Sequence, residues 1–316
     1  PSINYYVRKR IITDNLYGVD IMEEAAEIAK LRLFLVLVSS AQKVEDLEPL
    51  PNIDFNLMRG NSLIGLLTVD AKRFDASTNM QDMFQGENEK RYRQALAEKN
   101  RQIDVYRKTS SVTDNLQALR EKIEGLREEA YTDLNEILLD DFNRLGIRFE
   151  EVQLKGKAKK RALKTSDIKR LDPFHWGYEF DEIIETRGGF DIIIANPPWE
   201  VVQTTEKEFF LEYDQLIQKN KLKITEWKKQ RKKLMNNPEI RDAWLDYASQ
   251  YPHQWAYFKY AGQFVNQTTR VEGKASGNKP NLYNLFTEQC YNLLRPDGHC
   301  GIVIPSGIYT DFSTMQ

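Results

Sequence analysis

Several features that mark particular classes of protein are scarce in this sequence. Only two cysteines, Cys290 and Cys300, occur in 316 residues, too few for a disulfide framework or a metal site. The longest apolar run, residues 31–38, is interrupted by Arg32 and is too short to cross a bilayer. The first residues show no signal-peptide pattern. We therefore expect a cytoplasmic protein with no membrane partner and no metal ion.

A strong excess of either charge is also lacking. Lys and Arg total 45 and Asp and Glu total 47, so the formal net charge is −2. The mean hydropathy is −0.60, yet 41% of residues are hydrophobic, enough for one large or two modest domains. A nucleic acid would have to bind local basic patches, such as residues 155–170 and 227–233, or a part outside this chain. A solvated loop and a solvated helix face are the commoner explanations of such patches.

Strand and helix patterns alternate along much of the chain, which predicts an α/β fold with a mainly parallel sheet. The predicted strands are residues 15–21, 53–58, 190–195 and 301–304, and the predicted helices nearest to them are residues 23–40 and 282–294. The strand at 190–195 is apolar almost throughout, as expected when both faces are covered. Residues 200–270 read as helical and aromatic-rich, and residues 268–280 as a loop.

A charged segment interrupts this pattern. Apolar residues recur at helical spacing over residues 87–145, which predicts a helical hairpin or short antiparallel coiled coil. Residues 151–170 carry eight Lys or Arg against two acids and read as a mobile basic loop. We expect a first core part at 1–75, the helical insertion and basic loop at 76–170, and a second core part at 171–316 with a helical insertion at about 200–280.

The sharpest motif is Asn196-Pro197-Pro198-Trp199, directly after a predicted strand. In an open parallel sheet, ligands bind beyond the carboxyl ends of the strands. The two prolines remove two N–H donors and leave carbonyls free to accept hydrogen bonds. The amide of Asn196 adds an acceptor, and Trp199 offers a flat face on which a base can stack. Two acceptors aimed at an exocyclic amine would hold its lone pair toward an incoming methyl group. The alternative is a Pro-Pro turn with an aromatic packed beneath it.

This run resembles the (Asn/Asp/Ser)-Pro-Pro-aromatic motif of S-adenosyl-L-methionine-dependent amino-methyltransferases. Asn in first place is similar to the adenine-N6 members, whereas Ser would favour cytosine-N4. The surrounding sequence resembles the large methyltransferases that are fused with, or partnered to, restriction activity, and related phage-defence methylases. The resemblance implies a Rossmann-like sheet with the helical hairpin inserted. It also implies a flipped adenine in double-stranded DNA as substrate, with a nuclease and a recognition domain, fused or separate, as partners.

Three further stretches carry the resemblance and imply the cofactor contacts. Asp20, followed by Ile21, matches the acid that binds the ribose hydroxyls; taken alone, an acid in this position is more often one favoured at a helix N-terminus. Asn61 and Ser62 match the segment that reads the cofactor's adenine, and the alternative is a turn built on Gly-Asn. Phe286 matches an aromatic that packs on that adenine, and the alternative is a core residue of an amphipathic helix. The run Phe174-His175-Trp176 also recurs in the group, and we expect His175 to be structural.

The Gly-rich cofactor turn of the family is not found. It should precede Leu16, but residues 1–14 contain no glycine, and glycine is what lets a backbone approach such a ligand closely. The strand that carries this turn should lie between those ending at Asp20 and Asn196, so both should have open edges. We therefore expect this chain to be an internal fragment that binds cofactor poorly and is inactive alone.

Other functions remain open from the sequence. Asn-Pro-Pro-aromatic motifs also serve methylation of a glutamine amide in proteins and of bases in structured RNA. The missing glycine turn is compatible with a non-catalytic scaffold in which residues 87–145 are an interaction module, whereas the intact motif at Asn196 favours an enzyme.

Overall fold

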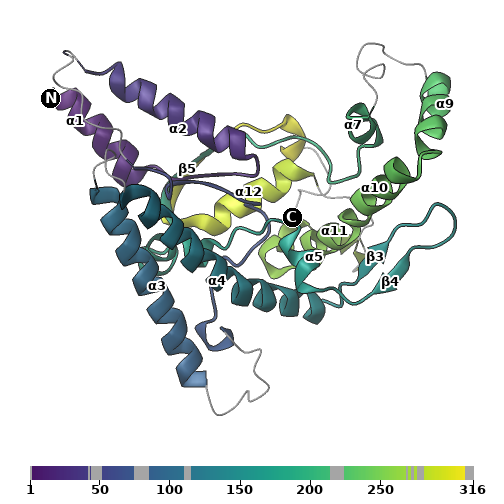
Figure 1. Ribbon diagram of the computed structural model, residues 1–316, viewed down its shortest axis with the longest axis horizontal. Coiled ribbons are helices and arrows are strands. Elements are labelled where there is room, and N and C mark those ends of the chain that lie inside the picture. Colours follow the sequence, from purple (N-terminus) through teal and green to yellow (C-terminus); the bar gives the residue numbers. More distant parts are fainter. Residues whose placement is uncertain are drawn as a thin grey trace. The chain divides into compact units, whose positions relative to one another are not determined.

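The computed structural model of the chain describes residues 2–41, 43, 52–74, 85–109, 115–213, 224–267, 270–271, 274–275 and 281–309. The chain divides into two compact units, and Figure 1 labels helices and strands of both. The first comprises Pro1–Leu138 and Ile168–Gly189, and the second comprises Leu139–Asp167 and Phe190–Gln316. Within the described residues, none of the helices combines the length and the apolar character that crossing a bilayer requires.

The first unit contains one parallel pair of strands and most of the long helices. Strand β1 pairs with β2 so that Gly18 lies opposite Leu57 and Asp20 opposite Arg59. The elements of this unit, with the parts of α4 and α5 that fall in it, are α1 Ile3–Arg10, η1 Ile11–Asn15, β1 Gly18–Asp20, α2 Glu23–Val38, β2 Leu57–Arg59, η3 Ala71–Arg73, α3 Gln85–Lys108, α4 Asn115–Arg144, α5 Thr165–Lys169, α6 Trp176–Glu179 and η4 Glu182–Thr186.

Helix α2 covers the β1–β2 pair. Two acids, Glu23 and Glu24, occupy its first turn, where a negative charge is favoured by the helix dipole. Its buried side supplies Leu37 to an apolar cluster with Tyr5, Ile12, Ile53 and Leu57. The predicted helix at 23–40 is therefore confirmed. The two predicted strands are confirmed only as three-residue strands, because residues 54–56 form a turn.

The two helices of the predicted hairpin, α3 and α4, both pack against the segment 174–181. Lys99 on α3 is 1% exposed, and its ammonium donates to the Tyr178 carbonyl and lies 2.9 Å from Asp181. Arg127 on α4 forms an ion pair with Glu179. The insertion is thus bound to the unit through buried charged groups, which need such partners because removal from water is unfavourable.

The second unit contains a parallel pair, β5 and β8, with the motif segment at its carboxyl end. Ile193 lies opposite Cys300 and Ala195 opposite Ile302. The elements of this unit beyond α4 and α5 are β3 Phe149–Glu151, β4 Lys159–Arg161, β5 Phe190–Ala195, α7 Glu206–Leu211, α9 Ile224–Met235, α10 Pro238–Ser249, α11 Tyr251–Tyr260, η5 Gly262–Gln267, β6 Arg270–Val271, β7 Lys274–Ala275, α12 Leu282–Leu293, β8 Leu294–Ile302 and η6 Ser306–Tyr309.

One face of the β5–β8 pair is open. Ile192 and Ile194 are 64% and 84% exposed, and Val303 is 58% exposed. The expectation that both faces of β5 are covered is therefore wrong for the described residues, since no described element packs over these side chains. In the described parts of the chain, β1 pairs only with β2 and β5 only with β8, which agrees with the predicted open edges.

The basic segment predicted as a mobile loop forms a short antiparallel hairpin instead. Phe149 pairs with Arg161 and Glu151 with Lys159. Cross-strand ion pairs explain why such a polar segment is ordered: Lys160 lies 2.6 Å from Glu150, and opposite charges on paired strands stabilise the pairing. Of the loop predicted at 268–280, only the short pair β6–β7 lies within the described residues.

Candidate functional site

The carboxyl end of β1 places Asp20 at the surface. Its backbone carbonyl accepts a hydrogen bond from the Gly60 N–H at 2.9 Å, which joins it to the end of β2. Its Oδ1 accepts from the Met22 N–H at 2.8 Å and so shapes the entry into α2, which is the structural role that an acid at a helix start is expected to have. The other carboxylate oxygen makes no hydrogen bond or ion pair with the described residues. Asp20 is exposed, and the following Ile21 is 57% exposed.

The turn after β2 brings Asn61 and Ser62 to the same edge as Asp20. The Asn61 Nδ2 donates to the Leu171 carbonyl at 3.2 Å, and its Oδ1 accepts from the Leu63 N–H at 3.2 Å. The Ser62 carbonyl accepts from the indole N–H of Trp176 at 3.0 Å. The amide of Asn61 therefore braces its own turn, which leaves one hydrogen and one lone pair for any ligand.

The segment Phe174-His175-Trp176 contacts this turn and the residues that follow it. His175 is fully buried; its Nδ1 accepts from the Leu66 N–H at 3.3 Å, and its Nε2 lies 3.2 Å from Asn135 Oδ1. Burial, with a smaller effect of the positive charge on Arg127, lowers the pKa of His175 to about 3. A neutral ring protonated on Nε2 satisfies both contacts. His175 is thus a structural residue, as predicted.

In the second unit, Asn196 and Trp199 lie beyond the carboxyl end of β5. Asn196 is exposed, Pro197 is buried and Trp199 is 54% exposed. Val303, which follows β8, is bonded both to the last residue of β5 and to the last residue of the motif. Its N–H donates to the Ala195 carbonyl at 3.1 Å, and its carbonyl accepts from Trp199 Nε1 at 3.2 Å. The alternative of a tryptophan packed beneath a turn does not hold, because more than half of this side chain is accessible.

The amide of Asn196 is not used for bracing. It makes no hydrogen bond with any residue in the described part of the chain, unlike the amide of Asn61. An exposed amide at the tip of a strand, followed by a buried proline, keeps its acceptor oxygen available in a fixed region of the surface.

Helix α12 begins against the motif. The Leu282 N–H donates to the Glu200 carbonyl at 2.8 Å, and Val201 forms an isolated antiparallel bridge with Asn281. Phe286 lies one turn further along this helix and is half-buried. The predicted residues are thus gathered in two groups, Asp20 to Ser62 in the first unit and Asn196 to Phe286 in the second.

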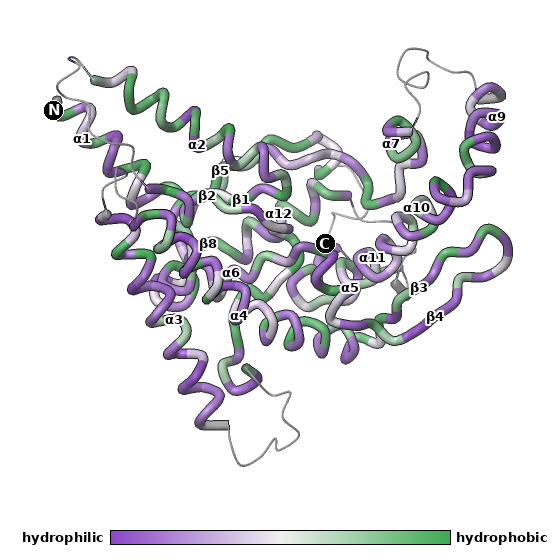
Figure 2. Tube along the Cα trace, in the orientation of Figure 1, coloured by the Kyte–Doolittle hydropathy of each residue, from purple (hydrophilic) through white to green (hydrophobic). Residues whose placement is uncertain are grey.

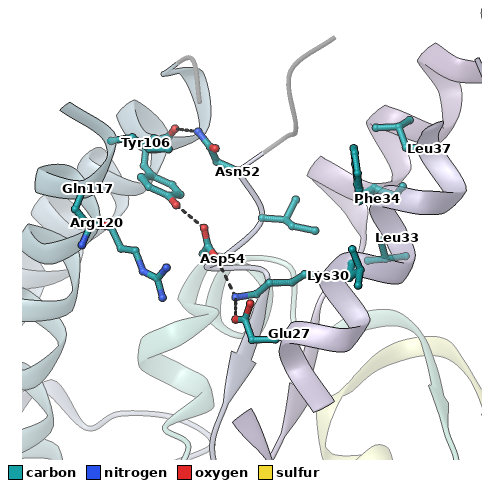
Figure 3. Close-up of a pocket in the computed structure, with 14 residues that line it drawn as sticks. Glu27, Lys30, Leu33, Phe34, Leu37, Asn52, Asp54, Tyr106, Gln117 and Arg120 are labelled. Carbon is teal, nitrogen blue, oxygen red and sulfur yellow. Dashed lines mark hydrogen bonds and ion pairs between the residues drawn. The ribbon is translucent and has the colours of Figure 1, made fainter. Parts of the chain in front are cut away.

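A cavity of about 420 Å³ in the first unit was not anticipated from the sequence. It is lined by α2, by residues 52–54 and by the facing ends of α3 and α4 (Figure 3). Lys30 lies 2.9 Å from Asp54 and 2.7 Å from Glu27, and the Tyr106 hydroxyl donates to Asp54. Lys30 and Glu27 lie on α2, whereas Asp54 and Tyr106 come from two distant segments, so no local pattern in the sequence indicates the group.

Hydrogen bonding outweighs burial in this cluster. Burial raises the pKa of Asp54. Hydrogen bonds from Lys30 and Tyr106 lower that pKa by more than burial raises it, so the net shift is downward. Burial lowers the pKa of Lys30, and its contacts with Asp54 and Glu27 raise it above the ordinary value. Both groups are therefore charged near neutral pH and satisfied by each other, which is the behaviour of a structural ion pair.

Comparisons with known proteins match the parts of the chain that carry these sites. The family model of the Eco57I restriction-modification methylase matches residues 14–230, a range that includes Asp20, Asn61 and Asn196. A putative type II restriction enzyme and methyltransferase from Methanocaldococcus jannaschii is 30% identical over 244 residues, which are 66% of this chain and 20% of that protein. The chain therefore spans about a fifth of that relative's length. No solved structure matches. By the extent of the family match, the chain belongs to the Eco57I restriction-modification methylase family.

Proposed function

We propose that this chain is the catalytic region of a DNA adenine-N6 methyltransferase that uses S-adenosylmethionine. The observation that carries the proposal is the state of the motif after β5. Asn196 is exposed with its amide uncommitted among the described residues, and Trp199 is anchored through its N–H while more than half of its surface stays accessible. Membership of a restriction-modification methylase family supports DNA as the substrate.

The residues at the β1–β2 edge fit the adenosine part of the cofactor. Asp20 keeps one carboxylate oxygen free to accept from hydroxyl groups, and Ile21 beside it exposes an apolar surface on which a purine can lie. Asn61 retains one donor and one acceptor position. When bound, the cofactor supplies an electrophilic methyl group on a positively charged sulfur.

The chain's own contribution would be positioning. A flipped adenine stacks on Trp199, an interaction of about 1–3 kcal/mol per base. Its amine donates one hydrogen to Asn196 Oδ1 and the other to the Pro197 carbonyl, so that the nitrogen lone pair is directed away from both acceptors. Orientation of this kind accelerates a transfer that needs no covalent intermediate on the protein.

Replacement of Asn196 tests the role directly. In the full-length protein, Asn196→Ala should abolish methyl transfer to unmethylated duplex DNA while leaving the circular dichroism spectrum unchanged. Asn143→Ala is the matched control, because Asn143 is an exposed asparagine at the end of α4 whose side chain has no hydrogen bond with the described residues. Undiminished transfer by the Asn196 variant would contradict the proposal.

The same enzyme preparation can be used to identify the substrate and the methylated product. Labelled methyl groups should appear in duplex DNA and not in structured RNA or in a glutamine-containing peptide. Mass spectrometry of the digested DNA should give N6-methyladenine. Recovery of N4-methylcytosine instead would retain the methyltransferase and refute the adenine assignment, and labelling of RNA or peptide alone would refute DNA as the substrate.

A further inference from the structure

Two segments of the second unit concentrate positive charge, although the chain as a whole is slightly acidic. Residues 152–166 and 227–238 contain eleven Lys and Arg and no Asp or Glu, in a chain of formal net charge −2. The first segment forms the tip and second strand of the β3–β4 hairpin, and the second forms most of α9 (Figure 1). Both are hydrophilic along much of their length (Figure 2).

Most of these positive charges are not neutralised by neighbouring acids. In the hairpin, Lys160 pairs with Glu150 and Arg161 with Asp167, and on α9 Arg231 pairs with Glu206. Eight lysines remain that are exposed and form no ion pair with the described residues: Lys155, Lys157, Lys159, Lys164, Lys228, Lys229, Lys232 and Lys233. We call these eight residues the lysine surface.

The four lysines of α9 share one side of the helix. Their spacing of one and four residues places them on adjacent rows, since residues four apart are neighbours on a helix surface. Trp227 is buried, and it lies with Leu234 in an apolar cluster around Trp244 of α10. The helix is therefore fixed by its apolar side, and its charged side faces solvent.

The β3–β4 hairpin packs against the same apolar cluster as α9. Val152, directly after β3, packs into the apolar cluster that holds Trp227 and Trp244. Its N–H donates to the hydroxyl of Ser249, the last residue of α10, at 2.9 Å. The two groups of lysines therefore belong to one packed body, so a ligand that contacts both meets a preformed arrangement of charges.

The chemistry of the surface favours a repeating polyanion. Lysine is a flexible point charge that neutralises phosphate, whereas the planar guanidinium of arginine is better suited to fixed contacts through two parallel hydrogen bonds. Duplex DNA carries one negative charge per about 1.7 Å of its axis, and each phosphate contact releases bound counterions. A run of lysines free of acids is suited to such contacts, which hold the duplex in register without reading its sequence.

We propose that the lysine surface binds the phosphate backbone of the same duplex whose target base reaches Asn196. The proposal rests on the proposed function for its choice of partner. It assigns the β3–β4 hairpin and the insertion that contains α9 a role in affinity, and it leaves sequence recognition to other parts of the protein.

The test compares three quadruple variants of the full-length protein in which lysines are replaced by glutamine. The α9 variant changes Lys228, Lys229, Lys232 and Lys233, and the hairpin variant changes Lys155, Lys157, Lys159 and Lys164. The control variant carries the same change of charge on exposed lysines of the first unit, namely Lys43, Lys72, Lys90 and Lys108. None of these replacements removes an ion pair with the described residues, so thermal stability should be unchanged in all three.

The readout is the dissociation constant for a 30-base-pair duplex as a function of salt, measured by fluorescence anisotropy. Each phosphate contact contributes about 0.9 to the slope of log K against log salt. The α9 and hairpin variants should each reduce that slope by about two to four and weaken binding at low salt, while the control should change neither. Slopes equal to that of the control, or tighter binding to single-stranded RNA than to the duplex, would overturn the proposal.

Methyl transfer by the unmodified protein separates this proposal from the proposed function. If the protein methylates duplex DNA but the lysine variants bind like the control, the lysine surface is refuted and the proposed function stands. If the unmodified protein binds duplex with the expected loss in both lysine variants but transfers no methyl group to DNA, the proposed function fails and the lysine surface is supported.

Discussion

The buried ring of His175 makes a quantitative prediction about the dependence of stability on pH. In the folded protein the pKa of His175 is lowered to about 3 by burial, whereas an exposed histidine titrates near about 6.5. Between these values the unfolded chain binds a proton that the folded protein does not, so stability falls as pH falls. Above about pH 6.5, titration of His175 does not reduce the free energy of unfolding. Below that pH, it reduces the free energy of unfolding by about 1.4 kcal/mol per pH unit. Lowering the pH from 7 to 4.5 should therefore remove about 3 kcal/mol through this residue alone.

Urea unfolding followed by circular dichroism, at half-unit steps between pH 7 and 4.5, measures this loss. His175→Gln keeps a donor for Asn135 and cannot titrate. Because it replaces a fully buried ring by a side chain of different shape, it should be less stable than the unmodified protein at pH 7. That difference should then shrink as the pH falls, because other titrating groups are common to both proteins. Phe174→Leu is the control: Phe174 is fully buried, so the change weakens packing but retains the histidine, and its stability deficit should stay constant. A constant deficit for His175→Gln over the same range would refute a neutral, buried His175.

Three further outcomes follow from the geometry. Trp199→Ala should lower kcat/KM for duplex DNA about 5- to 150-fold, which corresponds to a stacking energy of about 1–3 kcal/mol, and Trp199→Phe should recover part of it; a change below twofold would exclude stacking. Gly65→Ala should destabilise the protein by about 3 kcal/mol or more, because its φ is +149° and a Cβ would lie 2.0 Å from the Phe174 carbonyl oxygen, and an unchanged urea midpoint would contradict this. Gly125→Ala should instead stabilise α4 by about 0.5–1 kcal/mol, because its Cβ would meet nothing within 4 Å, and thermal melting would detect the opposite sign.

The elements that the sequence predicts well are those specified by local patterns. Helical spacing of apolar residues indicated α2, α3, α4 and α12 within a few residues of their observed ends. The position of Asn196 beyond a strand end followed from an apolar run stopped by two prolines. In each case the determining residues are close in sequence, so their pattern can be recognised without knowledge of the tertiary contacts.

The features that escaped prediction depend on distant partners. The amide of Asn61 is held by the Leu171 carbonyl, 110 residues away in sequence, and nothing in the Gly-Asn-Ser turn indicates that contact. The cluster of Lys30, Asp54 and Tyr106 joins three separate segments. The β3–β4 hairpin lacks an alternating apolar pattern and is supported by cross-strand charge pairs, so its composition resembled that of a loop.

The ion pairs that join α3 and α4 to residues 174–181 determine which parts of this protein can be deleted. The same stretch that receives Lys99 and Arg127 on one side meets the Asn61 turn on the other, where the Phe174 N–H donates to the Ile64 carbonyl at 2.8 Å. Excision of the hairpin would leave Asp181 and Glu179 without their cations and would expose Tyr178, which is fully buried. A shortened protein should therefore keep both helices. A deletion at the exposed tip of the β3–β4 hairpin should preserve the fold, but it would remove Lys155 and Lys157 of the lysine surface and weaken DNA binding.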